Sequence, residues 1–299
     1  MNNIFLFPGQ GSQKQGMGSG FSFSEEIWKE ADKILGFELS SIVATGDAAA
    51  LGETRVTQPA IYVTEVIILK ELISKGIRPQ AAAGHSLGEY AALVAVGSLS
   101  WEEGLELVRF RGEVFEKVGA ENPGGMLAVI GLKPDGVEEV LLSYEGASIA
   151  NYNSPGQDVV SAPKSQLEDL GKSLKAAGAK LVVPLKVSGG FHSALFKDAI
   201  PPMREKMDSL NFLDPEIPFY SNNTASALLS GEEIKESLLR QVTSPVRWVE
   251  LINSLSKDFG ENLRMIEAGP GKVLQGLMRR IDRTITSTGV SEPGDIEKL

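Results

Sequence analysis

Residues 81–90 read Ala81-Ala82-Ala83-Gly84-His85-Ser86-Leu87-Gly88-Glu89-Tyr90, in which Ser86 has a glycine two positions away on each side. This spacing is typical of a nucleophile elbow, where a serine occupies a strained turn between a strand and a helix and only glycine leaves room for the neighbouring backbone. Small residues precede the turn, and residues that favour a helix follow it. The stretch therefore predicts a strand–turn–helix unit with Ser86 as nucleophile; a buried serine in a turn is the alternative.

The first half of the chain has the pattern of an α/β fold, because short apolar runs alternate with amphipathic helices that can cover a sheet. Residues 4–7 form the first predicted strand. The glycine-rich turn Pro8-Gly9-Gln10-Gly11-Ser12-Gln13 follows this strand, and a helix is expected over residues 24–35.

Two further helices are marked by their first residues. One is expected from Thr57, as its N-cap, to residue 74, with Pro59 in its first turn. The other opens with the capping box Ser100-Trp101-Glu102-Glu103 and is expected to reach residue 118. The segment Glu121-Asn122-Pro123-Gly124-Gly125 then interrupts the helical pattern.

Residues 126–187 have the pattern of a self-contained unit in the order βαββαβ, which is that of a ferredoxin-like fold. Segments rich in glycine flank this unit on both sides and can act as hinges. We therefore expect a discontinuous large domain, 1–124 and 189–290, with an inserted subdomain at 125–188 and a loose polar tail at 291–299. The elements expected in the subdomain are strands 126–132, 147–153, 159–162 and 180–187 and helices 134–144 and 164–177.

Composition and charge exclude several classes of function. The 299 residues include no cysteine, which rules out disulfides, thiolate nucleophiles and cysteine-bound metals and fits a reducing cytoplasm. The formal net charge of −10 argues against nucleic acid as the main partner. No segment approaches the ~18 consecutive apolar residues of a membrane span, and the first residues lack a cationic leader. These features predict a cytoplasmic protein that does not act at a membrane.

A serine hydroxyl needs a base to take its proton, and the chain has only two histidines. His85 is adjacent to Ser86, so its side chain leaves the turn in a different direction. His192 lies in a glycine loop that enters a helix, and loops at domain junctions often carry catalytic bases. His192 is therefore the expected base, with a capping or core histidine as the alternative. No carboxylate stands out as a third member of a triad, so a distal acid or a carbonyl oxygen would have to orient the imidazole.

Two arginines on the helix that follows Trp101 have different surroundings, because residues three and four apart share a helix face. Arg109 aligns with glutamates and is expected to be a solvated partner in an acidic stripe. Arg111 aligns with Leu107, Phe115 and other apolar residues. A buried guanidinium is costly unless it is paired with a carboxylate, which can come from the protein or from a ligand. The spacing alone leaves both sources open.

Other glycine-rich segments do not match nucleotide-binding patterns. Gly9-Gln10-Gly11 lacks the third glycine of the dinucleotide fingerprint, although its N–H groups can stabilise an oxyanion. Gly269-Pro270-Gly271-Lys272 has the wrong spacing for a Walker loop, and Val273 stands where that loop has Ser or Thr. Two histidines without cysteine or an HExxH pattern predict no metal site, and no cofactor is expected.

The chain contains, in this order, the motifs Phe7-Pro8-Gly9-Gln10-Gly11-Ser12-Gln13, Gly84-His85-Ser86-Leu87-Gly88-Glu89, Arg111, Asn151-Tyr152-Asn153-Ser154-Pro155-Gly156-Gln157, Gly190-Phe191-His192-Ser193 and Glu267-Ala268-Gly269-Pro270-Gly271-Lys272. Together they resemble the family of malonyl-CoA:acyl carrier protein transacylases of type II fatty acid synthesis, over residues 4–285. The resemblance implies an α/β-hydrolase-like domain with a ferredoxin-like insertion. It also implies transfer of malonyl from coenzyme A, through an ester on the motif serine, to the phosphopantetheine thiol of acyl carrier protein.

The resemblance implies a role for each site residue. Ser86 would carry the malonyl ester, with His192 as general base and then acid. The backbone carbonyl that matches Gln241 would orient the histidine, and Arg111 would bind the free carboxylate of malonate. The other residues implied are Gln10 and Leu87, as N–H donors to the oxyanion, and Asn153 and Phe191, as substrate-binding residues, with Phe191 hindering an α-methyl group.

The resemblance implies malonyl-CoA and acyl carrier protein as partners, a monomer, and no bound cofactor. An acidic carrier protein would need a local basic patch on this acidic chain. The candidates are Lys186 and the group formed by Lys272, Arg279 and Arg280. Three alternatives remain open: a serine thioesterase or esterase that releases the acyl group to water, a stand-alone acyltransferase of a polyketide pathway, and a non-catalytic scaffold.

Overall fold

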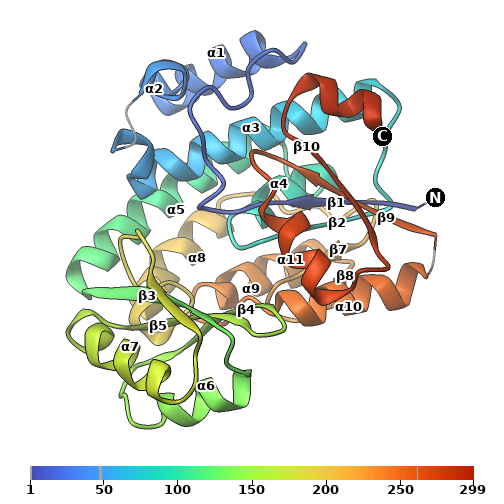
Figure 1. The fold of residues 1–299 in the computed structure, drawn as a ribbon. Coiled ribbons are helices and arrows are strands. Elements are labelled where there is room, and N and C mark those ends of the chain that lie inside the picture. Colours follow the sequence, from blue (N-terminus) through green and yellow to red (C-terminus); the bar gives the residue numbers. More distant parts are fainter. Residues whose placement is uncertain (1, 47–48, 261) are drawn as a thin grey trace.

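The computed structural model describes residues 2–46, 49–260 and 262–299, and a six-stranded sheet runs through its centre (Figure 1). The strand order is β10-β9-β1-β2-β7-β8, and all neighbouring pairs are parallel except β7 with β8. Parallel sheets covered by helices are typical of α/β proteins, so the expected α/β class is confirmed. The strands are β1 (Asn2–Phe7), β2 (Ala81–Gly84), β7 (Phe219–Tyr220), β8 (Ala227–Leu228), β9 (Leu263–Ala268) and β10 (Thr286–Val290).

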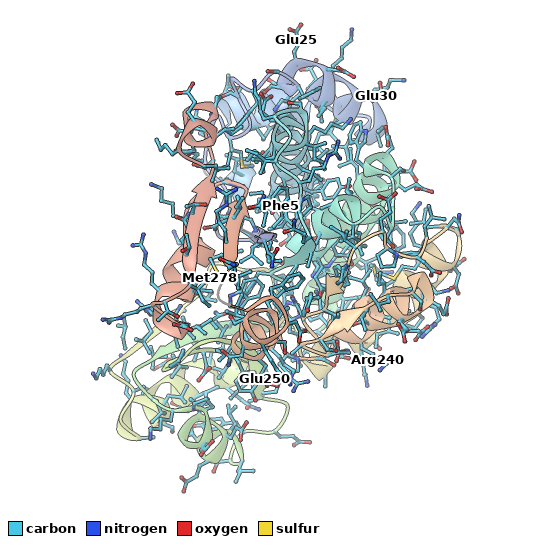
Figure 2. All side chains as sticks on the ribbon, turned by 90° about the vertical axis from the view of Figure 1, so that its right-hand side faces the viewer. Phe5, Glu25, Glu30, Arg240, Glu250 and Met278 are labelled. Carbon is cyan, nitrogen blue, oxygen red and sulfur yellow. The ribbon has the colours of Figure 1, made fainter. Side chains whose placement is uncertain are left out.

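Alternation along β1 sends its side chains into two separate cores. Phe5 and Phe7 belong to the larger core, whereas Ile4 and Leu6 belong to the smaller one. Figure 2 shows Phe5 deep inside the molecule. The larger core is covered by α1 (Ser24–Leu35), α2 (Leu39–Thr45), α3 (Thr54–Ser74), α4 (Gly88–Ala95), α5 (Trp101–Glu121), α8 (Ile200–Asp208) and α9 (Gly231–Gln241), and the smaller by α10 (Trp248–Phe259) and α11 (Val273–Ile281).

The structure confirms the expected starts of two helices. Helix α1 has the predicted bounds, and α5 begins with the predicted capping box. Ser100 Oγ accepts a hydrogen bond from the Glu103 N–H (3.2 Å), while the Glu103 carboxylate accepts one from the Ser100 N–H (3.1 Å). Helix α5 continues to Glu121, three residues beyond the predicted end. In the ranges that the structure describes, no helix is both long and apolar enough to cross a membrane.

The predicted start at Thr57 of the helix that ends at residue 74 was wrong. Helix α3 begins at Thr54, so Pro59 lies in its second turn, where it costs one intrahelical hydrogen bond. The Thr57 hydroxyl donates to the carbonyls of Leu51 (2.5 Å) and Glu53 (3.0 Å). The side chain therefore points back along the chain and caps no new helix.

A separate four-stranded antiparallel sheet forms the green and yellow part of Figure 1, in the order β4-β5-β3-β6. Along the chain its elements follow the predicted order βαββαβ. The last strand ends at Pro184, earlier than the predicted residue 187. The elements are β3 (Gly124–Ile130), α6 (Pro134–Leu141), β4 (Ser148–Ser154), β5 (Gln157–Pro163), α7 (Leu167–Ala176) and β6 (Leu181–Pro184).

The segment after Val290 is not the irregular tail that its polar composition predicts. Residues Pro293–Lys298 form a 3-10 helix, which opens with a capping box of Glu292 and Asp295. Ile296 and Leu299 pack against the larger core, and the Arg264 guanidinium donates to the Leu299 carbonyl. Apolar contacts with the larger core, together with Arg264 and the ion pair of Lys14 with Glu292, therefore order a segment that lacks any helical or strand periodicity.

Candidate active site

Ser86 occupies a turn between β2 and α4, in the backbone conformation of a nucleophile elbow. Its φ of 53° is in the left-handed region, which a non-glycine residue occupies only where the surroundings enforce it. A Cβ atom on Gly84 would lie 1.8 Å from the Gly88 carbonyl carbon, and one on Gly88 would lie 2.1 Å from the Phe7 carbonyl oxygen. The turn therefore requires both glycines, which explains their spacing around the serine.

His192 lies 106 positions along the chain from Ser86, yet its ring meets the serine hydroxyl. Ser86 Oγ is 2.8 Å from His192 Nε2, and His192 Nδ1 is 2.9 Å from the backbone carbonyl oxygen of Gln241. A carbonyl oxygen only accepts, so Nδ1 carries the ring proton and Nε2 is free to accept the serine proton. Gln241 is the last residue of α9, where helix carbonyls have no intrahelical partner and carry partial negative charge. The C-terminal carbonyl of α9 therefore occupies the position that the carboxylate has in a Ser-His-Asp triad.

Burial holds His192 in its neutral form. The side chain is 3 % exposed. Burial lowers the pKa of His192 to about 3; the hydrogen bond to Gln241 acts in the opposite direction, and the charge of Arg111 lowers it further. A neutral imidazole can act as a base, so the site is prepared to deprotonate Ser86 across the physiological pH range.

Arg111 is buried beside the serine, on the apolar face of α5, as its spacing predicts. It is 2 % exposed, and its Nη2 lies 3.4 Å from Ser86 Oγ. The guanidinium carbon lies 4.1 Å from the ring centre of Phe115 and 5.6 Å from that of Tyr90. Burial lowers its pKa, and in the described part of the chain its Nε has no hydrogen-bond partner. A planar carboxylate beside Ser86 would satisfy these donors.

Arg109 behaves as the sequence predicts for the other arginine of this helix. Its Nε lies 3.4 Å from Glu113 Oε1, and both side chains are about half exposed. The two arginines therefore sit on one helix in opposite environments, one paired in solvent and one buried beside the nucleophile.

A small cavity of about 90 Å³ opens onto Ser86, Arg111 and His192. Gln10 and Leu87 line it, and in the described chain their backbone N–H groups donate to no protein acceptor. Such N–H groups can stabilise an oxyanion that forms next to the serine. The remaining lining residues are Gln58, His85, Met126, Asn151, Leu185, Val187 and Phe191.

Phe191 forms the apolar wall of this cavity. Its ring centre lies 5.5 Å from that of Phe115 and 5.1 Å from that of Phe196, and the side chain is 7 % exposed. The same Phe115 ring contacts the Arg111 guanidinium. Phe191 is therefore held by its aromatic neighbours and has little freedom to move away from a bulky ligand.

Asn153, expected to bind substrate, is not among the residues that line the cavity. Its Oδ1 lies 2.7 Å from His85 Nε2, and the His85 ring packs 5.3 Å from that of Trp248. Asn151, two residues earlier on β4 and in the same sequence motif, lines the cavity instead. The structure thus places Asn153 as a support for His85, and it keeps His85 away from a role as the base.

Three buried polar groups around Ser86 were also missed by the sequence analysis: Asn222, Glu89 and the side-chain amide of Gln241. Asn222 Oδ1 accepts a hydrogen bond from the Ser86 N–H (2.7 Å), and Gln241 Nε2 donates to the Ser86 carbonyl (3.1 Å). Only the position of Glu89 in the serine motif offered a signal, because Asn222 and Gln241 lie far along the chain.

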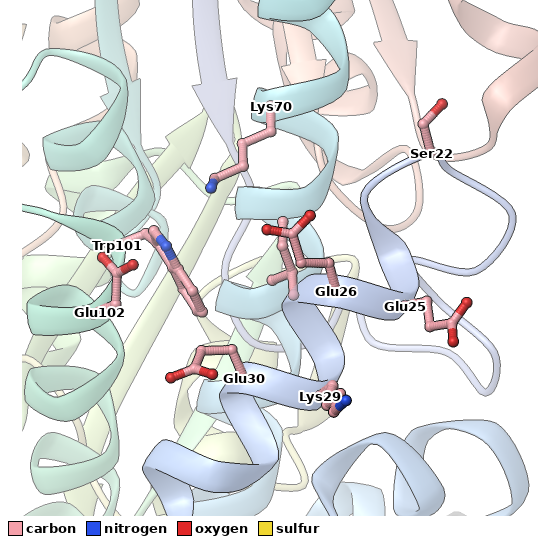
Figure 3. A pocket seen from close by; sticks show the side chains of 9 residues that line it. Ser22, Glu25, Glu26, Lys29, Glu30, Lys70, Trp101 and Glu102 are labelled. Atoms are coloured by element: carbon pink, nitrogen blue, oxygen red, sulfur yellow. The ribbon is translucent and has the colours of Figure 1, made fainter.

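A larger cavity of about 690 Å³ lies on another part of the surface, between α1, α3 and α5 (Figure 3). Glutamates surround it, and Lys70 stands 5.5 Å from the ring centre of Trp101. Among the described residues that line it, Ser22 is the one serine and none is a histidine; Ser22 donates to the Glu71 carboxylate. This cavity is larger than the one beside Ser86, but Ser86 and His192 meet in the smaller one.

Comparison with known proteins shows which family the chain resembles. A family model described as acyl transferase domain matches residues 4–291. Over nearly the full length of both chains, the protein is similar to the malonyl CoA-acyl carrier protein transacylases of Bacillus subtilis (40% identity, 98% of this chain and 94% of the relative) and Escherichia coli K12 (36%, 97% and 96%). A solved structure of a type II polyketide synthase acyl-carrier protein in complex with its malonyl-transacylase matches with a TM-score of 0.94 at 34% identity, covering 100% of this chain and 98% of that one.

Proposed function

This chain belongs to the acyl transferase domain family, and we propose that Ser86 carries the acyl group and that Arg111 selects which acyl group is bound. The chain transfers malonyl from malonyl-CoA to acyl carrier protein and so supplies malonyl units for fatty acid elongation. The observation that carries the residue assignment is the buried Arg111 guanidinium, 3.4 Å from a serine that lies 2.8 Å from a neutral histidine. A hydrolase of ordinary esters would have no use for a buried cation at this position.

In the first half-reaction, Ser86 Oγ attacks the thioester carbonyl of malonyl-CoA while His192 Nε2 takes the hydroxyl proton. The N–H groups of Gln10 and Leu87 face the oxyanion of the tetrahedral intermediate, where one such donor is worth roughly 3 kcal/mol. Collapse breaks the C–S bond, and the leaving sulfur receives the proton from His192. The products are free coenzyme A and the malonyl ester of Ser86.

In the second half-reaction, the phosphopantetheine thiol of the carrier protein gives its proton to His192 Nε2 and attacks the ester carbonyl. As the second tetrahedral intermediate collapses, His192 returns the proton to Ser86 Oγ and the C–O bond breaks. The α9 carbonyl of Gln241 stabilises the imidazolium that exists between these two transfers. The enzyme returns to its starting state, and the cycle needs no cofactor.

Arg111 and Phe191 define which acyl group fits. The free malonate carboxylate pairs with the guanidinium, whereas an acetyl group leaves that buried charge unpaired. Phe191, fixed by Phe115 and Phe196, hinders an α-methyl substituent, so malonyl is favoured over methylmalonyl.

The chain organisation that we propose is an α/β-hydrolase-like domain, 1–124 and 189–290, with a ferredoxin-like subdomain at 125–188. The elbow between β2 and α4 supports the first part. The sheet order β4-β5-β3-β6, with α6 and α7 packed against this sheet in one core, supports the ferredoxin-like subdomain.

We further propose that the protein is a cytoplasmic monomer and that Lys186 contacts the carrier protein. Lys186 is exposed and lies between Leu185 and Val187, which line the cavity. Lys272, Arg279 and Arg280 are exposed at α11 and form a second candidate patch.

The intact mass of the protein after brief mixing with malonyl-CoA tests the proposed function. We expect one malonyl adduct, which stays until carrier protein is added and then moves to the carrier thiol. Release of free malonate without an adduct would instead support the thioesterase. A protein that forms no adduct and has no turnover would be a scaffold.

The neutral state of His192 predicts an unusual pH dependence. A histidine with an ordinary pKa of ~6.5 would lose about 90 % of its basic form on acidification from pH 7.5 to 5.5 and slow the reaction about tenfold. The pKa of His192 is lowered to about 3 by burial, so the imidazole remains basic throughout this window. Stopped-flow loading from malonyl-CoA should therefore show no tenfold fall centred near pH 6.5. A tenfold fall with a midpoint near pH 6.5 would contradict a buried, neutral base.

A further inference from the structure

Asn222 forms a clamp across the serine turn. It is fully buried, its Oδ1 accepts the Ser86 N–H (2.7 Å), and its Nδ2 donates to the Gly84 carbonyl (2.6 Å). The two bonds therefore hold the backbone on both sides of His85. Ser86 is in a left-handed conformation that costs free energy, and such a conformation persists only where other contacts fix it.

Glu89 joins this clamp to the loop that orients the base. Its carboxyl group, 1 % exposed in the first turn of α4, accepts the backbone N–H of Asn222 at Oε1 (2.5 Å). At Oε2 it accepts the side-chain amide of Gln241. Both partners are donors, so each oxygen of the buried carboxyl group is satisfied by a group from a different segment.

Gln241 contacts the nucleophile and the base at the same time. Its side-chain Nε2 donates to the Ser86 carbonyl (3.1 Å), and its backbone carbonyl accepts from His192 Nδ1 (2.9 Å). A displacement of this residue therefore moves the imidazole relative to the serine turn.

We propose that Glu89 is a positioning residue, which holds Ser86 and His192 in register by fixing Asn222 at the serine turn and the side-chain amide of Gln241. The inference rests on the proposed serine chemistry. Glu89 and Asn222 are not among the residues that line the cavity. Within the described chain Arg111 makes no hydrogen bond to either, although the charge of Glu89 favours the charged form of the guanidinium. Loss of the Glu89 hydrogen bonds should therefore lower kcat and leave KM for malonyl-CoA nearly unchanged, because a misplacement of about 1 Å at a nucleophile costs on the order of 100-fold in rate.

Two nearly isosteric variants test this inference. In Glu89→Gln an amide nitrogen replaces one carboxyl oxygen. This nitrogen cannot accept a hydrogen bond, so the bond from either the Asn222 N–H or the Gln241 amide is lost. Gln241→Met removes the side-chain amide and keeps the backbone carbonyl that faces His192. We expect kcat for malonyl loading to fall about 10- to 100-fold in each, with KM within about twofold. A fluorophosphonate probe, which needs an activated serine but no malonate pocket, should label both variants more slowly by the same factor.

Glu71→Gln is the matched control, because Glu71 is also buried and accepts two bonds, from the N–H (2.9 Å) and hydroxyl (3.1 Å) of Ser22. It should lose stability without a change in kcat. A wild-type protein that forms no malonyl adduct would defeat the proposed function itself. Wild-type kcat in folded Glu89→Gln and Gln241→Met, or an equal loss in Glu71→Gln, would overturn the positioning role alone.

Discussion

Replacement of Ser86 by Ala is expected to abolish the malonyl adduct and lower malonyl transfer to the carrier by about 10⁴-fold or more. Without Oγ there is no atom to form the ester, and His192 has no proton to take. The residual N–H donors and Arg111 remain, so the variant should still bind malonyl-CoA. Intact-protein mass and a carrier-loading assay measure the loss, and calorimetric titration measures the retained binding.

We expect Ser86→Ala to keep its fold, because an alanine at a φ of 53° retains the backbone strain of the serine without adding a clash. Thermal unfolding measures this. An adduct that persists in the folded variant would place the nucleophile elsewhere. A variant that transfers malonyl at a tenth of the wild-type rate would equally exclude a covalent route through this residue.

Replacement of Arg111 by Ala is expected to lower the preference for malonyl-CoA over acetyl-CoA by about 10³-fold. In the wild type the guanidinium is buried, and in the proposed mechanism it gains a carboxylate when malonyl binds. An acetyl group leaves the buried cation unpaired, and the variant removes that penalty together with the attraction for malonate. Competition between the two thioesters, followed by the mass of the acyl-enzyme, measures the change in preference.

Arg109→Ala is the matched control, since it removes an arginine two residues away on the same helix. Its side chain is solvent-exposed and paired with Glu113, and such pairs contribute at most about 1 kcal/mol to stability. The ratio of malonyl to acetyl loading should stay within about twofold of wild type. If both variants changed this ratio alike, the effect would come from α5 as a whole and not from the buried guanidinium.

Local patterns predicted those parts of the fold that depend on neighbours in the sequence. The elbow could be recognised because Gly84 and Gly88 are required within one turn, where any Cβ would collide with backbone. The capping box at Ser100 and the βαββαβ order of 126–187 are equally local. The wrong start of α3 has a local cause too, since a threonine hydroxyl can bond backward to a carbonyl as well as forward to an N–H.

The order after Val290 could not be predicted, because it depends on packing against a core built from other segments. Which of Asn151 and Asn153 lines the cavity could not be predicted either. Both lie on β4, and only the placement of His85 and Trp248 decides which one faces the cavity.

By itself, the sequence determined which residues are capable of the chemistry: one serine in a turn that only glycines permit, one histidine outside that turn, and an arginine whose helical spacing places it on the apolar face. Only the tertiary structure decided how they act together. Residues that lie 106 to 155 positions from Ser86 along the chain provide the imidazole and the two side-chain amides that hydrogen-bond to it. Burial, which depends on the packing of every surrounding element, then leaves the imidazole neutral. Among the described residues, no carboxylate forms a hydrogen bond or ion pair with the guanidinium.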